Sequence, residues 1–235
     1  MYSNILGYQV FNKSKTELIE EINKRERVNI VSGNPEILYN GLNNELLHKN
    51  FQAEYSIIIP DGVGTVLAAK LVKQPVKEKI AGIEIMKEIL EKCVREEKSV
   101  YLLGAKEEIL KDCIVKIIGD FEGIKIVGSH NGYFDINNCS DIVNDVIKSK
   151  ADVIFVAMGS PRQEQFIEEH INELPCKIFM GVGGSFDVFS GNIKRAPKWM
   201  IKCGLEWLYR VVKEPWRIKR LGAIPKFLWR VLGSK

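Results

Sequence analysis

The 235-residue sequence contains no run of about 20 consecutive apolar residues, so we expect no helix that crosses a bilayer. It has three histidines, no Asp-x-Asp pair and no His/Cys cluster at zinc-ligand spacing, so we expect no protein-built metal site and no cofactor. Its five cysteines lack Cys-x-x-Cys spacing, which indicates free thiols in a reducing compartment. The N-terminal residues lack the pattern of a signal peptide, and we therefore expect a cytoplasmic protein.

Tryptophan is missing from the first 198 residues, and all four tryptophans follow: Trp199, Trp207, Trp216 and Trp229. Residues 190–235 also hold 12 of the 34 Lys and Arg residues but only two of the 30 Asp and Glu residues, which leaves 22 basic and 28 acidic residues before them. The net charge of +4 thus combines an acidic body with a basic, aromatic tail. Such a tail is typical of docking on an anionic membrane surface. Packing on its own body or on another subunit stays open.

Short β-branched runs alternate with amphipathic stretches in the body. The runs predict strands over 5–10, 28–32, 55–59, 100–103, 124–127, 153–158 and 177–182. The stretches predict helices over roughly 15–25, 35–47, 63–72, 83–97, 106–119, 140–149 and 161–172. This alternation predicts an α/β fold with a mostly parallel sheet and helices on both faces. Ligands bind such sheets beyond the carboxyl ends of the strands.

The tail reads as helices interrupted by Pro197, Pro215 and Pro225, the first of them over 197–213. We therefore divide the chain into a catalytic core over 1–190 and a helical appendage over 191–235 that associates with a membrane.

Pro60-Asp61-Gly62 directly follows a predicted strand. Asp61 stands where it would N-cap a helix that begins near Gly62. A carboxylate at the end of a strand is also placed to act as a general base. The two roles are compatible, although capping bonds would lower the pKa of the carboxyl and weaken it as a base.

The segment 160–164 follows another predicted strand and has the residues of a capping box. Ser160 would be the N-cap, Pro161 the first helical residue and Gln163 the reciprocal partner. The same helix start would present backbone N–H groups to a diphosphate, which Glu164 would oppose unless it points toward sugar hydroxyls.

The segment 181–185 ends a strand with glycines and begins like a dinucleotide fingerprint, but Phe186 replaces the last glycine. A turn around phosphate or ribose is the alternative interpretation. His130 lies in the loop 128–134, where a structural histidine and a functional one are both open.

Six segments together resemble the WecG/TagA/CpsF glycosyltransferase family. They are 32–36 (SGNPE), 60–62 (PDG), 128–134 (GSHNGYF), 159–164 (GSPRQE), 181–196 (GVGGSFDVFSGNIKRA) and 204–220 (GLEWLYRVVKEPWRIKR). The resemblance implies a Rossmann-like core and a C-terminal appendage that closes the site at the membrane. It also implies inverting transfer of N-acetylmannosamine from a UDP-sugar donor to a polyprenyl (undecaprenyl)-diphosphate-linked GlcNAc acceptor. The product would be the linkage unit of wall teichoic acid or a related cell-surface polysaccharide.

By position, Asp61 matches the family's catalytic base. The substrate-binding residues that the resemblance implies are Ser32, Asn34, Lys79, Tyr133 and Gln163. The implied nucleotide and diphosphate ligands are Gly183, Gly184, Ser185, Asp187, Arg210, Arg217 and Arg220. Three residues depart from the family pattern: Ser32 stands for a threonine, Lys79 for an arginine and Glu84 for an aspartate. The donor therefore stays open among N-acetylmannosamine, glucose and a mannosaminuronic acid.

Two other classes of protein remain as alternatives. A nicotinamide-dependent oxidoreductase is disfavoured by the broken glycine fingerprint at Phe186. A nucleic-acid-binding module is disfavoured by the acidic body and by the lack of a recognisable motif, so we expect no nucleic-acid partner. The prediction is a peripheral enzyme on the inner face of the cell membrane, with the question of a homo-oligomer left open.

Overall fold

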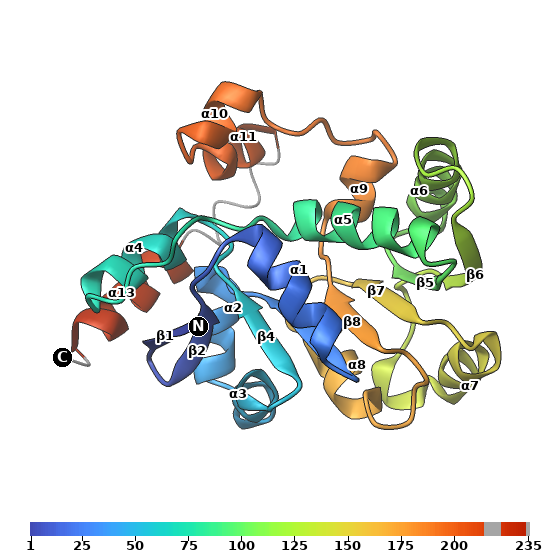
Figure 1. Ribbon diagram of the computed structural model, residues 1–235, viewed down its shortest axis with the longest axis horizontal. Helices are drawn as coiled ribbons and strands as arrows, with labels where there is room; N and C mark the ends of the chain where they lie inside the picture. Colours follow the sequence, from blue (N-terminus) through green and yellow to red (C-terminus); the bar gives the residue numbers. More distant parts are fainter. Residues whose placement is uncertain (214–221, 234–235) are drawn as a thin grey trace.

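The structure is a computed structural model that describes residues 1–213 and 222–233, apart from the side chains of Lys198, Lys202 and Arg210. Its centre is an eight-stranded sheet in the order β1-β2-β4-β3-β8-β7-β5-β6 (Figure 1). The strands are β1 (Tyr2–Ile5), β2 (Tyr8–Phe11), β3 (Val28–Ser32), β4 (Ser56–Ile59), β5 (Ser99–Gly104), β6 (Lys125–His130), β7 (Val153–Ala157) and β8 (Ile178–Gly181). Only the pair β1 and β2 is antiparallel, so the predicted mostly parallel sheet is confirmed.

The prediction of one strand over 5–10 is wrong, because the chain reverses there. Ile5 pairs with Tyr8 across a two-residue turn, in which Leu6 and Gly7 have φ values of 55° and 88°. Glycine adopts such a left-handed conformation without steric cost, which favours the turn at this point. The continuous apolar pattern of the segment conceals the turn, because both strands of the hairpin contribute buried residues.

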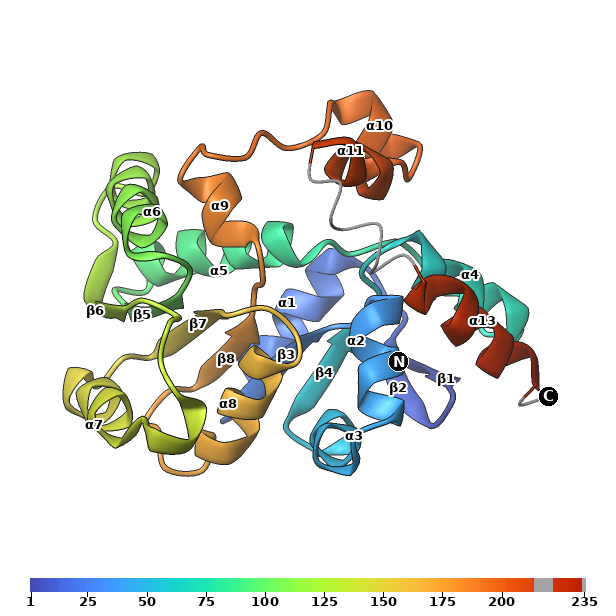
Figure 2. The same cartoon turned by 180° about the vertical axis from the view of Figure 1, so that it is seen from behind.

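Helices cover both faces of the sheet, as predicted (Figures 1 and 2). One face carries α1 (Lys15–Lys24), α5 (Gly82–Arg95), α6 (Glu107–Asp120) and α9 (Ser185–Phe189). The other carries α2 (Pro35–Leu42), α3 (Glu45–Gln52), α7 (Ser140–Ser149) and α8 (Arg162–His170), with α4 (Val63–Leu71) toward the β1–β2 end and the short 3₁₀ helix η1 (Ile136–Asn138) before α7. Alternate residues of a strand enter opposite cores, as Leu102 and Leu103 of β5 do.

The helix predicted over 35–47 is two helices. α2 ends at Leu42, and α3 begins anew at Glu45 because the side chain of Asn44 accepts a hydrogen bond from the backbone N–H of Leu47. Asparagine is among the preferred N-cap residues, so it terminates one helix pattern and starts the next.

The single helix predicted over 197–213 is also wrong. It is divided into α10 (Lys198–Lys202) and α11 (Glu206–Lys213) at Gly204, which has a φ of 73°. Both views show these two helices standing apart from the layers of the body, above α4 and α5 (Figures 1 and 2). A Cβ on Gly204 would lie 2.5 Å from Val63 Cγ2, so the turn between the two helices touches the start of α4.

The last helix, α13 (Ala223–Gly233), packs instead against α2 and α4. Its Phe227 and Val231 are fully buried in the same core as Leu38 and Ala68. The boundary at residue 190 stays a prediction, but the two described parts of the appendage meet the body in different ways. Among the described helices, none has the length and hydropathy that a membrane crossing requires.

Candidate active site

The predicted site residues follow neighbouring strands at the carboxyl edge of the sheet. Asp61 follows β4, Asn34 follows β3, Gly183 follows β8 and Gln163 follows β7, and these four strands are adjacent in the sheet. The helix after β3 packs on one face of the sheet and the helix after β8 on the other. Neighbouring strands whose following helices diverge in this way open a crevice in which α/β proteins bind their ligands.

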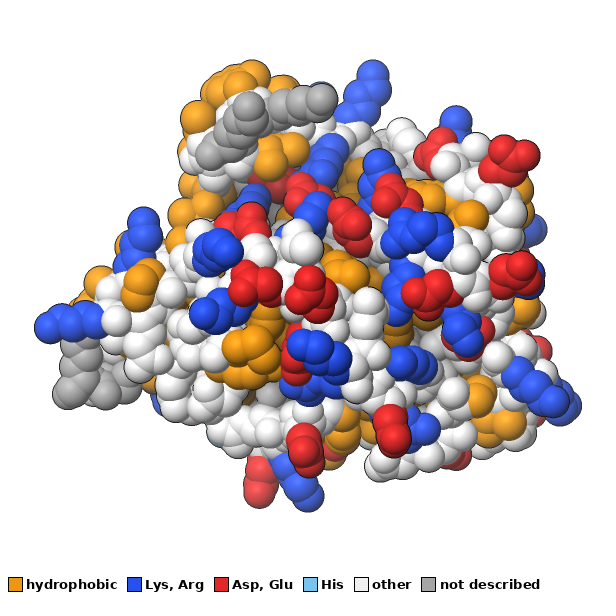
Figure 3. Space-filling view, viewed as in Figure 1, with side chains coloured by type: hydrophobic (Ala, Val, Ile, Leu, Met, Phe, Trp, Pro, Cys, Tyr) orange, Lys and Arg blue, Asp and Glu red, His pale blue; other side chains and the backbone are white. Residues whose placement is uncertain are grey.

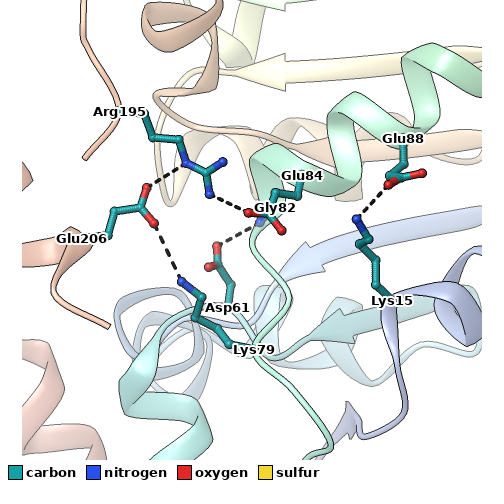
Figure 4. A network of polar contacts seen from close by, with 8 residues as sticks. All are labelled: Lys15, Asp61, Lys79, Gly82, Glu84, Glu88, Arg195 and Glu206. Carbon is teal, nitrogen blue, oxygen red and sulfur yellow. Dashed lines mark hydrogen bonds and ion pairs between the residues drawn. The ribbon is translucent and has the colours of Figure 1, made fainter. Parts of the chain in front are cut away.

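Ser32 and Gly82 are two donors that hold the Asp61 carboxylate at this edge. Its Oδ2 accepts a hydrogen bond of 2.7 Å from Ser32 Oγ. The same oxygen accepts one of 3.4 Å from the backbone N–H of Gly82 (Figure 4). Gly82 is the first residue of α5, and the N–H groups of a first helical turn have no partner within their own helix. The positive end of the α5 dipole therefore faces the carboxylate.

The prediction that Asp61 caps the following helix is wrong. Gly62 is the N-cap of α4, and no side chain makes a capping hydrogen bond there. Gly62 has a φ of 87°, which turns the chain so that Asp61 points toward β3 and α5 rather than toward α4. Asp61 therefore does not cap α4, and of the two interpretations only that of a general base remains.

Ser32 and Asn34 lie beside Asp61, as the resemblance implied. Asn34 Oδ1 accepts a hydrogen bond of 3.0 Å from the N–H of Ile37 and so caps α2. A Cβ on Gly62 would lie 3.9 Å from Asn34 Cβ, so this cap adjoins the turn that carries Asp61. The structure thus brings three predicted site residues together, while their roles stay predictions.

Gln163 connects two strand-end loops from a buried position, 2% exposed. Its Oε1 accepts a hydrogen bond of 3.0 Å from Gly183 N, and its Nε2 donates one of 2.7 Å to Glu164 Oε1. The predicted capping box is wrong, because the N-cap of α8 is Pro161 and no side-chain capping bond is present. Gln163 faces inward, and its hydrogen bond with Gly183 joins the loop after β8 to α8. The sequence pattern around Gln163 cannot reveal this tertiary contact.

Glu164 is a buried carboxyl beside Gln163, and it is 6% exposed. Burial raises its pKa to about 7, against a lowering by its hydrogen bond from Gln163. Its Oε2 has no hydrogen-bond partner among the described residues. Because burial favours the uncharged form of Glu164, this residue opposes an anion less than an exposed carboxylate would.

The glycine-rich loop leads into the short helix α9. Gly183 has a φ of 50°, and Ser185 Oγ donates a hydrogen bond of 2.7 Å to the carbonyl of Val182. Gly184 is the N-cap of α9, and Asp187, in its first turn, is half-buried. Phe186 is fully buried in the core under α1, α5 and α6, which explains why the last glycine of a dinucleotide fingerprint is missing. Phe186 therefore anchors α9 in the core.

Tyr133 lies in the loop after the edge strand β6, and it is 69% exposed. This loop runs back over the ends of β5 and β7, since a Cβ on Gly132 would lie 3.1 Å from Gly104 Cα and 3.2 Å from Met158 Cγ, and Arg162 donates to the carbonyl of Phe134. In the sheet, β8 and β3 still separate β7 from β4, which Asp61 follows. In the same loop, His130 Nδ1 donates to the carbonyl of Asn131 over 2.8 Å and its ring meets Phe134 edge to face. These contacts favour the structural interpretation of His130.

A network of ion pairs ties the start of α11 to the loop before α5 (Figure 4). Arg195 Nη2 lies 2.8 Å from Glu84 Oε1, and Arg195 Nε lies 3.5 Å from Glu206 Oε1. The other oxygen of Glu206 lies 3.8 Å from Lys79 Nζ. Lys79, a predicted substrate-binding residue, is therefore paired with the appendage three residues before the glycine that bonds Asp61.

A profile of the Glycosyl transferase WecG/TagA/CpsF family matches residues 3–235. The chain belongs to this family. It is 40% identical over 177 residues to the N-acetylglucosaminyldiphosphoundecaprenol N-acetyl-beta-D-mannosaminyltransferase of Bacillus subtilis (strain 168), which covers 75% of this chain and 68% of that protein. The protein of the same name from Bacillus spizizenii (strain ATCC 23059 / NRRL B-14472 / W23) is 37% identical over 203 residues, 86% and 78% of the two chains. Its namesake from Staphylococcus aureus (strain MW2) is 35% identical over 239 residues, 99% and 92%.

Membership of the WecG/TagA/CpsF family confirms the resemblance drawn from the six motifs, and it makes the chain a glycosyltransferase. Of the predicted appendage ligands, Arg217 and Arg220 lie outside the described residues, as does the side chain of Arg210. Arg195 was missed by the sequence analysis although it lies inside a matching segment. Its role becomes visible only from Glu84 and Glu206, which are 111 and 11 residues away in the chain.

The five cysteines are free, as predicted. No group of three or more His, Cys, Asp or Glu side chains that could hold a metal ion occurs in the described part of the chain.

Proposed function

We propose that this glycosyltransferase moves N-acetylmannosamine from a UDP donor to a polyprenyl-diphosphate-linked GlcNAc with inversion at the anomeric carbon. The proposal draws its substrates from the names of the relatives, which are N-acetylglucosaminyldiphosphoundecaprenol N-acetyl-beta-D-mannosaminyltransferases. The observation that carries it is the Asp61 carboxylate, oriented by Ser32 and Gly82 at the carboxyl edge of the sheet.

Inversion takes one displacement at the anomeric carbon. Asp61 accepts the proton of the acceptor hydroxyl while the hydroxyl oxygen bonds to the anomeric carbon and the bond from that carbon to UDP breaks. The leaving diphosphate takes the electron pair of that bond, and nearby cations and backbone N–H groups stabilise its charge. Hydrogen bonds from Ser32 and Gly82 to one carboxylate oxygen keep the base in a single orientation, which general-base catalysis requires.

The acceptor is a lipid, so the enzyme has to work at a membrane surface. Large apolar side chains are exposed on three helices that lie around the same end of the molecule: Val63 and Leu67 on α4, Trp199 on α10, and Trp207, Leu208 and Val212 on α11. Figure 3 shows hydrophobic side chains gathered where α10 and α11 lie. Together with the basic charge of residues 190–235, this surface supports a peripheral position on the inner face of the cell membrane.

The substrates are tested by incubating the protein with UDP-N-acetylmannosamine, UDP-glucose and UDP-N-acetylmannosaminuronic acid, each with a short-chain prenyl-diphosphate-GlcNAc. Mass spectrometry identifies the lipid-linked disaccharide and NMR its anomeric configuration. We expect transfer of N-acetylmannosamine in the β configuration. Transfer of another sugar alone would replace the donor, and the absence of any disaccharide would overturn the proposal.

The base is tested with Asp61→Asn, which removes the proton acceptor and keeps the shape. Turnover should fall by about 10²–10⁴-fold, while UDP binding measured by calorimetry persists. Asp120→Asn, an exposed acid at the end of α6, is the matched control and should leave turnover unchanged. Near-wild-type turnover in Asp61→Asn would remove this residue from the mechanism.

The orientation of the base is tested at Ser32. Ser32→Ala removes the donor to Asp61 and should lower turnover by about tenfold, whereas Ser32→Thr restores a hydroxyl and should retain activity.

A further inference from the structure

The carboxylate of Glu206 bridges two cations at the mouth of the site. One of its oxygens faces Arg195 Nε at 3.5 Å and the other faces Lys79 Nζ at 3.8 Å. The three side chains are only 15%, 27% and 23% exposed, so the bridge is partly withdrawn from solvent. Figure 4 shows the two cations converging on this carboxylate from opposite sides, Arg195 from the segment after α9 and Lys79 from the loop before α5.

An arginine and a lysine that converge on one anion are typical of sites that hold phosphate oxygens. A guanidinium and an ammonium group placed on two oxygens of one anion form charge-assisted hydrogen bonds, and they form them with phosphate as with carboxylate. A diphosphate carries more negative charge than one carboxylate and presents more acceptor oxygens, so it competes favourably for the same pair of cations.

The bridge also lies next to the proposed base. Lys79, Gly82 and Glu84 belong to one short segment, in which Gly82 donates to Asp61 and Glu84 accepts from Arg195. Glu206 is the first residue of α11, a helix that the turn at Gly204 separates from α10. Displacement of this carboxylate would therefore remove one tie between α11 and the loop that borders Asp61.

We infer that Lys79 and Arg195 form a subsite for the diphosphate group of a substrate, and that the Glu206 carboxylate occupies this subsite until a diphosphate displaces it. Arg195 is thus a diphosphate-binding residue, and Glu206 is a competitor that links occupancy of the site to the position of α11. The inference rests on the proposed function for its substrates, since both the UDP donor and the lipid acceptor contain a diphosphate.

The test measures binding of four probes by calorimetry to the wild type, Glu206→Gln and Arg195→Gln. The probes are inorganic pyrophosphate, UDP, uridine and geranyl diphosphate. Glu206→Gln should bind pyrophosphate about three- to tenfold more tightly, because the competing charge is gone. Arg195→Gln should bind it about ten- to a hundredfold more weakly, and uridine binding should be the same in all three proteins. The affinities of UDP and geranyl diphosphate show which substrate supplies the diphosphate. The affinity of that probe should change in the two variants in the same way as the affinity of pyrophosphate.

The matched control is Glu88→Gln on α5, which breaks the 2.8 Å pair with Lys15 of α1 and removes the same charge outside the bridge (Figure 4). It should leave all four affinities unchanged. Pyrophosphate binding that is unaltered in Arg195→Gln, or no tighter in Glu206→Gln than in Glu88→Gln, would overturn the inference.

A second measurement uses the wild type alone and needs no variant to fold. Hydrogen exchange of the α11 amides, residues 206–213, should rise when pyrophosphate binds, because Glu206 leaves the body. A merely structural ion pair predicts no change or slower exchange, and that result would refute the displacement. If the wild type neither binds UDP nor transfers a sugar, the proposed function fails, while the pyrophosphate measurements still decide the inference.

Discussion

The two described parts of the appendage, α10–α11 and α13, are joined to the body by different kinds of interaction. α13 inserts Phe227 and Val231 into the core between α2 and α4. α11 is tied through Glu206 to Arg195 and Lys79, and through Arg195 to Glu84. The tail thus contains a more apolar segment, α13, that is part of the hydrophobic core, and a more polar segment, α11, that is tied to the body by ion pairs.

The difference decides how easily each part moves. Burying a large apolar side chain contributes about 1.5–3 kcal/mol, and losing one costs more because a cavity remains. A partly exposed ion pair contributes about 0–1 kcal/mol and weakens as salt is added. We therefore expect α13 to stay in place while α11 can be displaced by a competing anion.

The largest expected effect is that of Phe227→Ala. It should lower the free energy of unfolding by about 3–5 kcal/mol, because a fully buried aromatic ring is removed. Urea denaturation measures the change. Trp229→Ala is the control on the same helix and should stay within about 0.5 kcal/mol, since Trp229 is 79% exposed. Equal effects of the two variants would show that α13 is not docked as described.

Glu164 provides a test, inside the body, of whether burial determines how strongly a charge affects the free energy of unfolding. Its pKa is raised by burial to about 7 in the folded protein, so the folded state keeps a proton that the unfolded state loses first. Stability should therefore fall as the pH rises from about 4.5 to 7, by about 3 kcal/mol in total. Glu164→Gln should abolish this fall and be more stable than the wild type at pH 8. Parallel stability curves of the two proteins from pH 4.5 to 8 would contradict the prediction.

The exposed tryptophans sharpen the comparison at the membrane. Trp199 on α10 is 62% exposed and Trp229 on α13 is 79% exposed. Each Trp→Ala change should weaken binding to anionic vesicles by roughly 1 kcal/mol, about fivefold, in a sedimentation assay. Tyr133→Ala, which removes an exposed aromatic from the loop after β6, outside α10, α11 and α13, should leave vesicle binding unchanged. If Trp229→Ala alone has an effect, α13 rather than α10 makes the lipid contact.

The smallest expected effect is that of salt, which should speed hydrogen exchange in α11 but not in α13. Raising NaCl to 1 M shortens the screening length to about 3 Å and weakens the pairs of Arg195, Glu206 and Lys79. Hydrogen exchange in 206–213 should become faster by up to about fivefold, whereas exchange in 223–233 should not. Equal protection of both helices at high salt would show that charge does not hold α11.

Much of the fold was predictable because local periodicity survives in a buried parallel sheet. The strand over 28–32 and the helix over 140–149 were predicted with the boundaries that the structure has. The position of Asp61 at a strand end was also predictable, since a Pro-Asp-Gly turn after an apolar run marks that place. Two kinds of prediction failed. The predictions over 5–10, 35–47 and 197–213 missed a turn within one apolar pattern, and the interpretations of Asp61, Ser160 and Gln163 depended on where a side chain points.

Local pattern in the chain was enough for the alternation of strands and helices, the family and the set of residues at the carboxyl edge of the sheet. Two facts depended on which distant segments meet. Asp61 turns from α4 toward Ser32 and Gly82 because Gly62 reverses the chain, and the appendage splits because Phe227 finds an apolar gap while Glu206 finds two cations. Helical hydrogen bonding and the hydropathy pattern act between near neighbours in the chain, whereas strand pairing, packing and ion pairing join residues that only the folded chain brings together.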